Sequence, residues 1–396
     1  MKTRLNAKNN DELSILGFGC MRFPTKGGAI DEPRSVAMIR KAIEQGINYF
    51  DTAYIYHGGK SESLLGTALE GGYREKVKIA TKLPPYMVSK LEGARKILEN
   101  QLRKLKTDYI DYYLLHMLTD KAMFDRMVNL GVMTWLEELK SKGVIKNIGF
   151  SFHGGKQDFL LILNAYPWDF CQIQYNYLDE NNQATREGLE AAASKRLPVI
   201  VMEPLRGGKL VTHLPGEVVK AFKDQNSRWS PAEWALRWIW NHRSVTVVLS
   251  GMSDEAQLEE NLRIAGDMKP GSLTGKELEV FERVKAVMLE KTKVPCTACG
   301  YCMPCPAGVD IPGCFSSYND KFLMSDGTAR LRYFQSLGAL SAKPAVASRC
   351  IECGKCESHC PQNIPIRREL KNVARSMEGF LYKPLVGVVR RIMRVK

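Results

Sequence analysis

The chain has 396 residues, of which 44% are hydrophobic and 25% are charged, and its formal net charge is +14. This composition is typical of a globular protein, and the length allows one large domain followed by a small one. No apolar stretch is long enough to span a bilayer, and residues 1–10 lack the apolar core of a signal peptide. We therefore expect neither a membrane-spanning nor a secreted protein, but a cytoplasmic one.

Short segments rich in β-branched and aromatic residues recur at intervals of roughly 25 to 50 residues. We expect strands at 13–20, 48–52, 77–81, 109–115, 145–151, 170–175, 199–202 and 245–249. Helical patterns fill the intervals, at 33–45, 62–70, 89–105, 124–142, 157–165, 183–195, 231–241 and 254–265. Eight strand-then-helix units predict a (β/α)8 TIM barrel of the α/β class, with an extra closing helix at 273–291. A doubly wound open sheet is the rival fold, but no G-x-G-x-x-G motif follows the first strand.

Polar side chains stand at the ends of neighbouring predicted strands, which is where TIM barrels carry their active sites. Asp51, Lys82 and His116 follow the second, third and fourth strands, and Tyr56 lies in the loop after Asp51. A single histidine or tyrosine at such a position is more often structural, and Asp51 and Lys82 could form a structural ion pair. Four such residues on neighbouring strand ends are a candidate catalytic group.

The segment around Asp51 resembles a family signature. Residues 48–62 read NYFDTAYIYHGGKSE, which is similar to the Phe-Asp-Thr-Ala…Tyr-Gly…Ser-Glu segment of the aldo-keto reductase family. Further matches follow in the family's order: ATK at 80–82, DYYLLH at 111–116, IGFS at 148–151 and EPL at 203–205. The resemblance covers about residues 10–290. It implies a barrel that binds a nicotinamide dinucleotide and reduces or forms a carbonyl.

The resemblance also implies roles for the candidate catalytic group. Tyr56 would be the general acid that protonates the carbonyl oxygen as hydride arrives at carbon. Lys82 would stabilise the phenolate, Asp51 would hold Lys82 in place, and His116 would orient and polarise the substrate carbonyl. The expected reaction is the reduction of a small aldehyde or ketone with NADPH or NADH, or the reverse oxidation of an alcohol.

The same resemblance implies how the dinucleotide is held. Ser151 and Gln174 would bind the nicotinamide carboxamide, and Leu205 lies in the loop that would cross the pyrophosphate. The segment 250–261, with Gln257 and Asn261, would surround the adenosine end.

The sequence departs from the family at four of these positions. They are Phe152 in place of asparagine, Met202 in place of a stacking tyrosine, and Gly251 and Gln257 in place of a lysine and an arginine. Because a 2′-phosphate prefers cationic partners, the choice between NADP and NAD stays open. Arg206 or Lys209 could still supply the missing charge.

Eight of the eleven cysteines form two runs near the C-terminus, each ending in Cys-Pro. The first run is Cys296, Cys299, Cys302 and Cys305, and the second is Cys350, Cys353, Cys356 and Cys360. The second run has the C-x2-C-x2-C-x3-C-P spacing with which bacterial ferredoxins hold [4Fe–4S] clusters. Zinc is the main alternative, although zinc sites usually combine two C-x2-C pairs. Disulfides are disfavoured because eight closely spaced cysteines cannot easily pair with relaxed geometry.

In two-cluster ferredoxins the fourth cysteine of each run binds the other cluster. That rule gives one cluster to Cys296, Cys299, Cys302 and Cys360, and the other to Cys350, Cys353, Cys356 and Cys305. The first run has only two residues between its third and fourth cysteines, so one cluster instead of two stays open. With MEPLRGG at 202–208, the runs resemble the subgroup of aldo-keto reductases that carry a C-terminal ferredoxin-like domain.

These observations predict three regions. They are a barrel at 1–291, a small, mainly α-helical 4Fe–4S ferredoxin-type domain at 292–370, and a basic tail at 371–396. Residues 361–396 contain nine lysines and arginines against two glutamates. Such a tail could contact an anionic membrane surface or an acidic partner, although packing on its own domain is favoured. Nothing beyond the net charge supports nucleic-acid binding.

The purpose of the clusters stays open at this point. Nicotinamide gives two electrons as hydride, a cluster passes one at a time, and no flavin-binding domain is recognisable. The clusters could be structural, could serve a redox partner protein, or could act with an undetected cofactor. An iron–sulfur electron-transfer protein whose barrel binds nucleotide or a redox partner is the alternative function. The four intact catalytic candidates argue against a third reading, a regulatory subunit without turnover.

Overall fold

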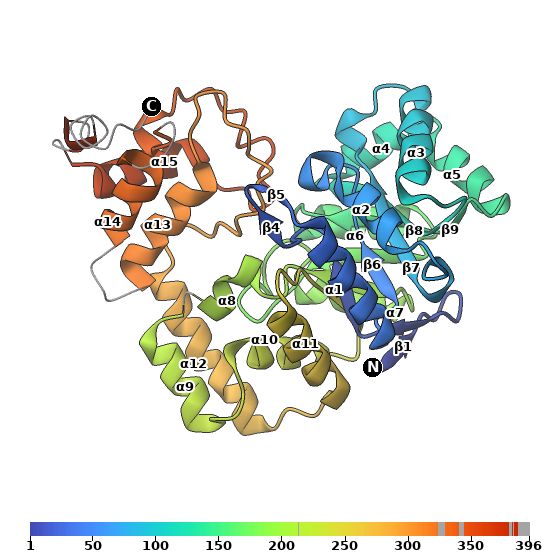
Figure 1. The fold of residues 1–396 in the computed structure, drawn as a ribbon, viewed down its shortest axis with the longest axis horizontal. Helices are drawn as coiled ribbons and strands as arrows, with labels where there is room; N and C mark the ends of the chain where they lie inside the picture. Colours follow the sequence, from blue (N-terminus) through green and yellow to red (C-terminus); the bar gives the residue numbers. More distant parts are fainter. Residues whose placement is uncertain (213, 324–328, 340–343, 380–381, 383, 387–396) are drawn as a thin grey trace. The chain divides into compact units, whose positions relative to one another are not determined.

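The structure is a computed structural model, and it describes residues 1–212, 214–323, 329–339, 344–379, 382 and 384–386 (Figure 1). The chain divides into two compact units, Met1–Pro204 with Ala235–Leu273, and Leu205–Trp234 with Thr274–Lys396. The limits expected from the sequence, 1–291, 292–370 and 371–396, stay a prediction. The end of the expected tail, residues 387–396, lies outside the described residues, and so does any contact it makes with a membrane or partner.

Eight parallel strands close into a barrel in the order β10-β11-β12-β3-β6-β7-β8-β9, which confirms the predicted TIM barrel. Their bounds are β3 Leu16–Gly19, β6 Tyr49–Asp51, β7 Lys78–Leu83, β8 Ile110–Leu118, β9 Ile145–Phe152, β10 Phe170–Gln174, β11 Val199–Met202 and β12 Val245–Ser250. Strands of this kind are buried on both faces, and this is why they read as continuous apolar runs in the sequence.

The strand predicted at 13–20 is wrong as a single element. Its first part is β2 Glu12–Ser14, which pairs antiparallel with β1 Thr3–Leu5, and only β3 enters the barrel. The buried Leu13 of this hairpin packs against the interior residues Tyr49 and Tyr112. The hairpin therefore adds an apolar residue to the barrel interior. A second small hairpin joins β4 Thr25–Lys26 and β5 Ala29–Ile30.

Helices fill the intervals between the strands, as predicted (Figure 1). They are α1 Glu32–Glu44, α2 Ser61–Ala68, α3 Leu91–Leu105, α4 Lys121–Asn129, α5 Val132–Ser141, α6 Lys156–Ala165, α7 Thr185–Ser194, α10 Pro231–Trp240 and α11 Glu255–Asp267. The single helix predicted at 124–142 is wrong, because Gly131, with a φ of 75°, separates α4 from α5. Glycine adopts this left-handed conformation at little cost.

The second unit is mainly helical. It contains α8 Lys209–Thr212, α9 Gly216–Gln225, α12 Gly275–Lys291, α13 Ile311–Leu323, α14 Ala329–Tyr333, a π-helical stretch Phe334–Ala339 and α15 Ile366–Met377. The sequence did not indicate α8 and α9, whereas α12 is the predicted closing helix. Thr274 and Glu277 form a capping box that fixes where α12 begins.

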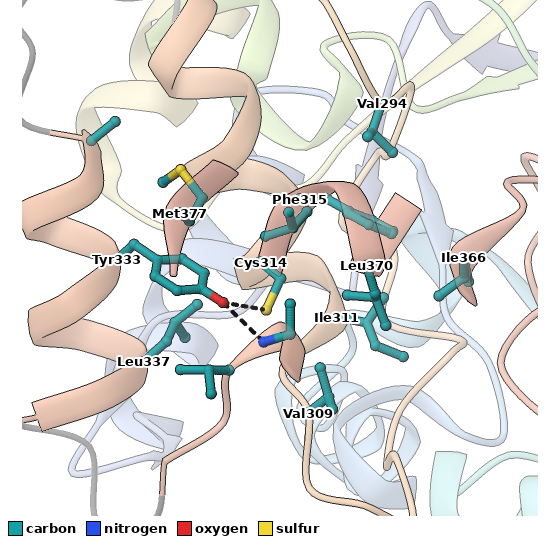
Figure 2. Close-up of a cluster of buried hydrophobic side chains, with 14 of the residues drawn as sticks. Val294, Val309, Ile311, Cys314, Phe315, Tyr333, Leu337, Ile366, Leu370 and Met377 are labelled. Atoms are coloured by element: carbon teal, nitrogen blue, oxygen red, sulfur yellow. Dashed lines mark hydrogen bonds between the residues drawn. The ribbon is translucent and has the colours of Figure 1, made fainter. Parts of the chain in front are cut away.

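A separate apolar core holds the second unit together (Figure 2). Phe315 of α13, Tyr333 of α14 and Leu370 of α15 are each at most 1% exposed and belong to this cluster. The Tyr333 hydroxyl accepts a hydrogen bond from the backbone N–H of Ala347 at 2.9 Å and donates one to Glu378 at 2.6 Å. Six cysteines of the two runs pack against the edge of this core. None of the described helices is long and apolar enough to cross a membrane.

Candidate functional site

The barrel interior is layered, and the layers explain where the candidate catalytic residues lie. Tyr49, Ala80 and Leu114 belong to one buried interior cluster on β6, β7 and β8. Because side chains alternate along a strand, the residue two positions further on faces the same interior. Asp51, Lys82 and His116 are these residues. Each of them therefore lies beyond this cluster toward the carboxyl end of its strand, where TIM-barrel active sites are built.

Lys82 and Asp51 form a buried ion pair. Their side chains are 0% and 4% exposed, and Lys82 Nζ lies 2.6 Å from Asp51 Oδ1. Lys82 also donates a hydrogen bond of 2.8 Å to the carbonyl oxygen of Thr52. Burial raises the pKa of Asp51 and lowers that of Lys82, and in both cases the charge of the partner opposes the effect. Each charge is thus tolerated inside the barrel because the other one is present.

Tyr56 and His116 lie beside this ion pair. The Tyr56 ring centroid is 5.0 Å from Lys82 Nζ and 6.0 Å from the His116 ring, which meets it edge-on at 79°. The turn Tyr56–Gly59 follows β6, and the left-handed conformation of Gly58 and Gly59 gives it its shape. Burial and the charge of Lys82 hold the pKa of His116 well below its usual value, so its imidazole is neutral. The structure therefore brings all four predicted residues together.

A buried hydrogen-bond network holds the backbone carbonyl of Lys82, and sequence reasoning missed it. Glu62 Oε1 accepts hydrogen bonds from Thr81 Oγ1 at 2.7 Å and from Gln101 Nε2 at 2.8 Å. Gln101 Nε2 also donates to the carbonyl oxygen of Lys82 at 3.0 Å, and Gln101 Oε1 accepts from the Tyr113 hydroxyl at 2.8 Å. Glu62 ends the segment NYFDTAYIYHGGKSE, so one member of the network stood in a recognised motif, but nothing in the sequence connected Gln101 to it.

His153 is a second missed residue. It is 3% exposed, and burial lowers its pKa to about 4, although a hydrogen bond with Gln183 opposes the shift. Its charge would act on His116 and disfavour protonation there. The neighbouring Phe152 is fully buried, and its ring lies 5.2 Å from that of Phe159. Position 152 therefore serves the packing of the barrel, and the next polar side chain after Ser151 is His153.

The residues predicted to bind nicotinamide are buried and engaged in hydrogen bonds. Ser151 Oγ accepts from the backbone N–H of Met117 at 2.7 Å. Gln174 Nε2 donates to Asp179 Oδ2 at 2.9 Å, which fixes the orientation of the amide. Met202 Sδ lies 3.6 Å from Gln172 Nε2.

The predicted adenosine segment follows β12. Asn261 of α11 is buried and donates to Ser250 Oγ at 2.9 Å. Gln257 turns back onto the helix N-terminus, where its Nε2 donates to Asp254 Oδ2 at 2.7 Å. Leu205, the residue predicted to lie over the pyrophosphate, belongs to the second unit and precedes a 3-10 turn at Arg206–Gly208.

Two arginines that sequence reasoning missed lie near the adenosine segment. A Cβ added to Gly251 would be 3.1 Å from the Cβ of Arg22, so this exposed arginine lies directly against Gly251. Arg34 Nη2 is 2.5 Å from Glu255 Oε2 at the start of α11, and its charge is largely neutralised there.

The two cysteine runs begin with the same backbone geometry, although only the first contains a cis peptide bond, Met303–Pro304. Ala298 and Glu352, each two residues after the first cysteine, have φ values of 57° and 58°, and Gly300 and Gly354 have 80° and 76°. The N–H groups of Ala298 and Glu352 each lie 3.4 Å from the sulfur of the preceding first cysteine. Such N–H···S contacts are known to tune iron–sulfur clusters. The repeat thus builds two equivalent thiolate-binding loops.

The equivalence continues beyond the fourth cysteine of each run. The N–H of Gly308 bonds to the carbonyl of Cys305, and that of Asn363 to Cys360, at 2.9 and 3.1 Å. Helices α13 and α15 then begin at Ile311 and Ile366, each six residues after that cysteine. The matching sequences CPAGVDI and CPQNIPI carried this signal, and sequence reasoning did not use it.

The positions of the thiols agree with crossed ligation. Cys296, Cys299, Cys302 and Cys360 line one small cavity of the second unit. Burial raises the pKa of Cys302 to about 12, and the charges of the other three cysteines of that set add to the shift. For Cys356, burial raises the pKa first, and Cys350 and Cys305 contribute. Among the described residues, no three His, Cys, Asp or Glu side chains converge as ligands of one metal ion would.

Two protein-family models match different parts of the chain, and the first match includes residues 205–234 of the second unit. The model of the aldo/keto reductase family matches residues 15–269, and that of a 4Fe-4S dicluster domain matches residues 295–365. The chain is 28% identical over 309 residues to L-galactose dehydrogenase of Arabidopsis thaliana, covering 72% of this chain and 95% of that protein.

Solved structures show the same fold. The holo form of aldo-keto reductase AKR11C1 from Bacillus halodurans matches with a TM-score of 0.60 and 27% identity, over 72% of this chain and 96% of that one. An aldo/keto reductase from Klebsiella pneumoniae in complex with NADP and acetate matches with a TM-score of 0.58 and 22% identity, over 72% and 96%. The chain is an oxidoreductase that belongs to the aldo/keto reductase family and carries a C-terminal 4Fe-4S dicluster domain.

Proposed function

We propose that the chain transfers hydride between a nicotinamide dinucleotide and a small carbonyl or alcohol substrate. The observation that carries this proposal is the run of contacts from Asp51 to Lys82, Tyr56 and His116. A buried ammonium beside a phenol favours the phenolate. A neutral imidazole beside the same phenol can donate a hydrogen bond to a carbonyl oxygen while it stays uncharged itself. These are the groups needed to add or remove a proton at that oxygen.

Each residue then has one task. Tyr56 gives its hydroxyl proton to the carbonyl oxygen while hydride arrives at carbon. The ammonium of Lys82 stabilises the phenolate left behind, and Asp51 keeps that ammonium charged and in place. His116 donates a hydrogen bond to the carbonyl oxygen and orients the substrate. In alcohol oxidation the same steps run in reverse.

The dinucleotide is proposed to contact Ser151 and Gln174 with its nicotinamide, Leu205 with its pyrophosphate, and the segment of Gln257 and Asn261 with its adenosine. The structural relative from Klebsiella pneumoniae holds NADP. In this chain, a 2′-phosphate would meet Arg22 beside Gly251 in place of the family's usual lysine and arginine. We therefore propose that both NADPH and NADH are used, with Arg22 favouring NADPH.

The two cysteine loops are proposed to hold two [4Fe–4S] clusters with crossed ligation. One is held by Cys296, Cys299, Cys302 and Cys360, and the other by Cys350, Cys353, Cys356 and Cys305. The donor set fits, since eight thiolates in two equivalent loops with N–H···S contacts suit iron–sulfur clusters. When bound, such clusters exchange single electrons.

One observation favours a second candidate function, electron exchange with a redox partner protein. Cys353 is exposed, and the apolar Ile351 beside it is 66% exposed. A cluster ligand at the surface next to an apolar residue suits a short-lived contact with another electron carrier. The carbonyl chemistry does not require this exchange, because hydride transfer is complete without a metal.

Replacing Tyr56 by phenylalanine tests the proposed reaction. Loss of the general acid should lower kcat/KM for aldehyde reduction by about 10²- to 10⁴-fold. Tyr54→Phe is the matched control, because Lys104 Nζ lies 4.7 Å from the Tyr54 ring, a geometry similar to that at Tyr56. If Tyr56→Phe keeps full turnover, the proposed mechanism is wrong. If neither wild type nor Tyr54→Phe reduces any aldehyde of a broad panel, while dithionite-reduced clusters donate electrons to an added carrier, the second function is favoured.

A further inference from the structure

The turn after β11 is joined to the start of the first cysteine run. Lys209 Nζ donates a hydrogen bond of 2.9 Å to the carbonyl oxygen of Cys296, and Arg206 Nη2 donates one of 3.3 Å to that of Pro295. These residues are 87 and 89 positions apart in the chain, and all of them belong to the second unit. Two cations from one turn therefore hold consecutive backbone carbonyls at the first expected cluster ligand.

The same segment is already fixed from its other side. Asn319 of α13 is 4% exposed, and its Oδ1 accepts from the N–H of Lys293 at 3.1 Å and of Val294 at 2.9 Å. Its Nδ2 donates to the carbonyl of Val294 at 2.6 Å. A neutral side chain thus suffices to place this segment, and the structure does not need a charge for that purpose. A half-buried ammonium costs free energy unless a negative charge lies close to it.

Asp320 supplies one negative charge close to Lys209, and the thiolate of Cys296 would supply a second one when it holds a cluster. Cys296 and Asp320 line the same small cavity as Lys209 and Arg206. A cluster held by four thiolates is anionic, and it gains one further negative charge when it takes up an electron. A fixed cation beside it stabilises the reduced form more than the oxidised form, because Coulomb attraction grows with the charge.

We propose that the positive charge of Lys209 raises the reduction potential of the cluster held by Cys296, Cys299, Cys302 and Cys360, with Arg206 supporting it. The inference rests on the cluster assignment of the proposed function. It also gives the turn a second role. Gly208 N and Leu210 N both bond to the carbonyl of Leu205, so the residue expected at the pyrophosphate and the charge at the cluster share one rigid turn.

The test is an anaerobic redox titration of the full-length holoprotein, with both clusters followed by electron paramagnetic resonance and absorbance. We call the cluster held by Cys296, Cys299, Cys302 and Cys360 the first cluster. In Lys209→Met, its ratio of reduced to oxidised form at a fixed potential should fall at least tenfold, which corresponds to a lowering of its reduction potential by about 59 mV for one electron. The second cluster should not change. Lys209→Arg should keep the wild-type potential. Lys220→Met is the control, because Lys220 is an exposed lysine of the same segment that pairs only with Asp224 among the described salt bridges.

A Lys209→Met protein with full iron content and a ratio within threefold of wild type overturns the proposal. If this variant loses its first cluster, Lys209→Gln decides, because glutamine can keep the hydrogen bond to Cys296 without the charge. A wild-type potential in Lys209→Gln, or loss of the cluster in that variant too, assigns Lys209 a purely structural role and overturns the proposal. Failure of the cluster assignment is recognised separately, by wild-type protein that holds no iron after oxygen-free purification.

Discussion

Lys82→Met is the change from which most can be learned about the barrel site. Lys82 Nζ lies 5.0 Å from the centroid of the Tyr56 ring. At this separation, with an effective dielectric constant of about 20, two unit charges attract by about 3 kcal/mol. Removing the ammonium withdraws this stabilisation from the phenolate that forms as the proton is transferred. We therefore expect kcat/KM to fall roughly 200-fold.

The change also leaves the carboxylate of Asp51 buried without its partner. Breaking a buried ion pair in this way typically costs about 3–5 kcal/mol of stability, so a loss of activity could reflect unfolding. The double variant Asp51→Asn with Lys82→Met removes both charges. It should recover most of the thermal stability of wild type while its kcat/KM stays as low as that of Lys82→Met.

The assay is steady-state reduction of the best aldehyde from a panel, with thermal unfolding measured on the same samples. Lys146→Met is the control, because the exposed Lys146 lies over the ring of Tyr109 at 5.1 Å and should matter little for turnover. A folded double variant that regains wild-type kcat/KM would refute the reasoning, since it would show that the charge of Lys82 stabilises the fold and not the transition state.

Three further predictions follow from the packing, the buried imidazoles and the cysteine loops. Since burial lowers the pKa of His153 to about 4, the unfolded chain binds a proton at higher pH than the folded one. The contribution of neutral His153 to stability is complete above about pH 6.5 and is lost as the pH falls toward 4. The free energy of unfolding of wild type, measured with urea, should therefore fall by about 3 kcal/mol more over this range than that of His153→Gln. Gly66→Ala places a Cβ 2.4 Å from the carbonyl oxygen of Lys104 and should lower the unfolding free energy by about 1–3 kcal/mol, whereas Gly93→Ala, with no atom within 4 Å, should not. Cys360→Ser should abolish the electron paramagnetic resonance signal of the cluster that Lys209 tunes, and Cys305→Ser should abolish that of the other cluster. The opposite assignment would contradict crossed ligation.

The barrel could be predicted because the burial of each strand leaves a pattern in that strand's own residues. A strand buried on both faces must be apolar throughout, and this pattern indicated all eight strands. The errors occurred where one residue redirected the chain. Gly131 interrupts a helix whose apolar pattern continues, and only Ile15 separates β2 of the hairpin from β3 of the barrel.

The candidate site was predictable in part. Asp51, Lys82 and His116 could be found because strand ends meet at one face of the barrel. The support that Gln101 gives to Glu62 and Lys82 could not, because it joins residues 39 and 19 positions apart through side-chain packing. The contact of Lys209 with Cys296 spans a still longer stretch of chain. The cytoplasmic location, the domain limits and the role of the basic tail stay predictions.

The most direct test of the proposed hydride transfer is to follow the transferred hydrogen. NADPH or NADH carrying deuterium at both C4 positions is mixed with the protein and an aldehyde, and the alcohol is analysed by mass spectrometry. We expect one deuterium on the carbinol carbon of each product molecule, with the clusters remaining oxidised throughout. An alcohol whose new carbon-bound hydrogen comes from solvent, formed while the clusters are reduced and reoxidised, would contradict the proposed hydride transfer.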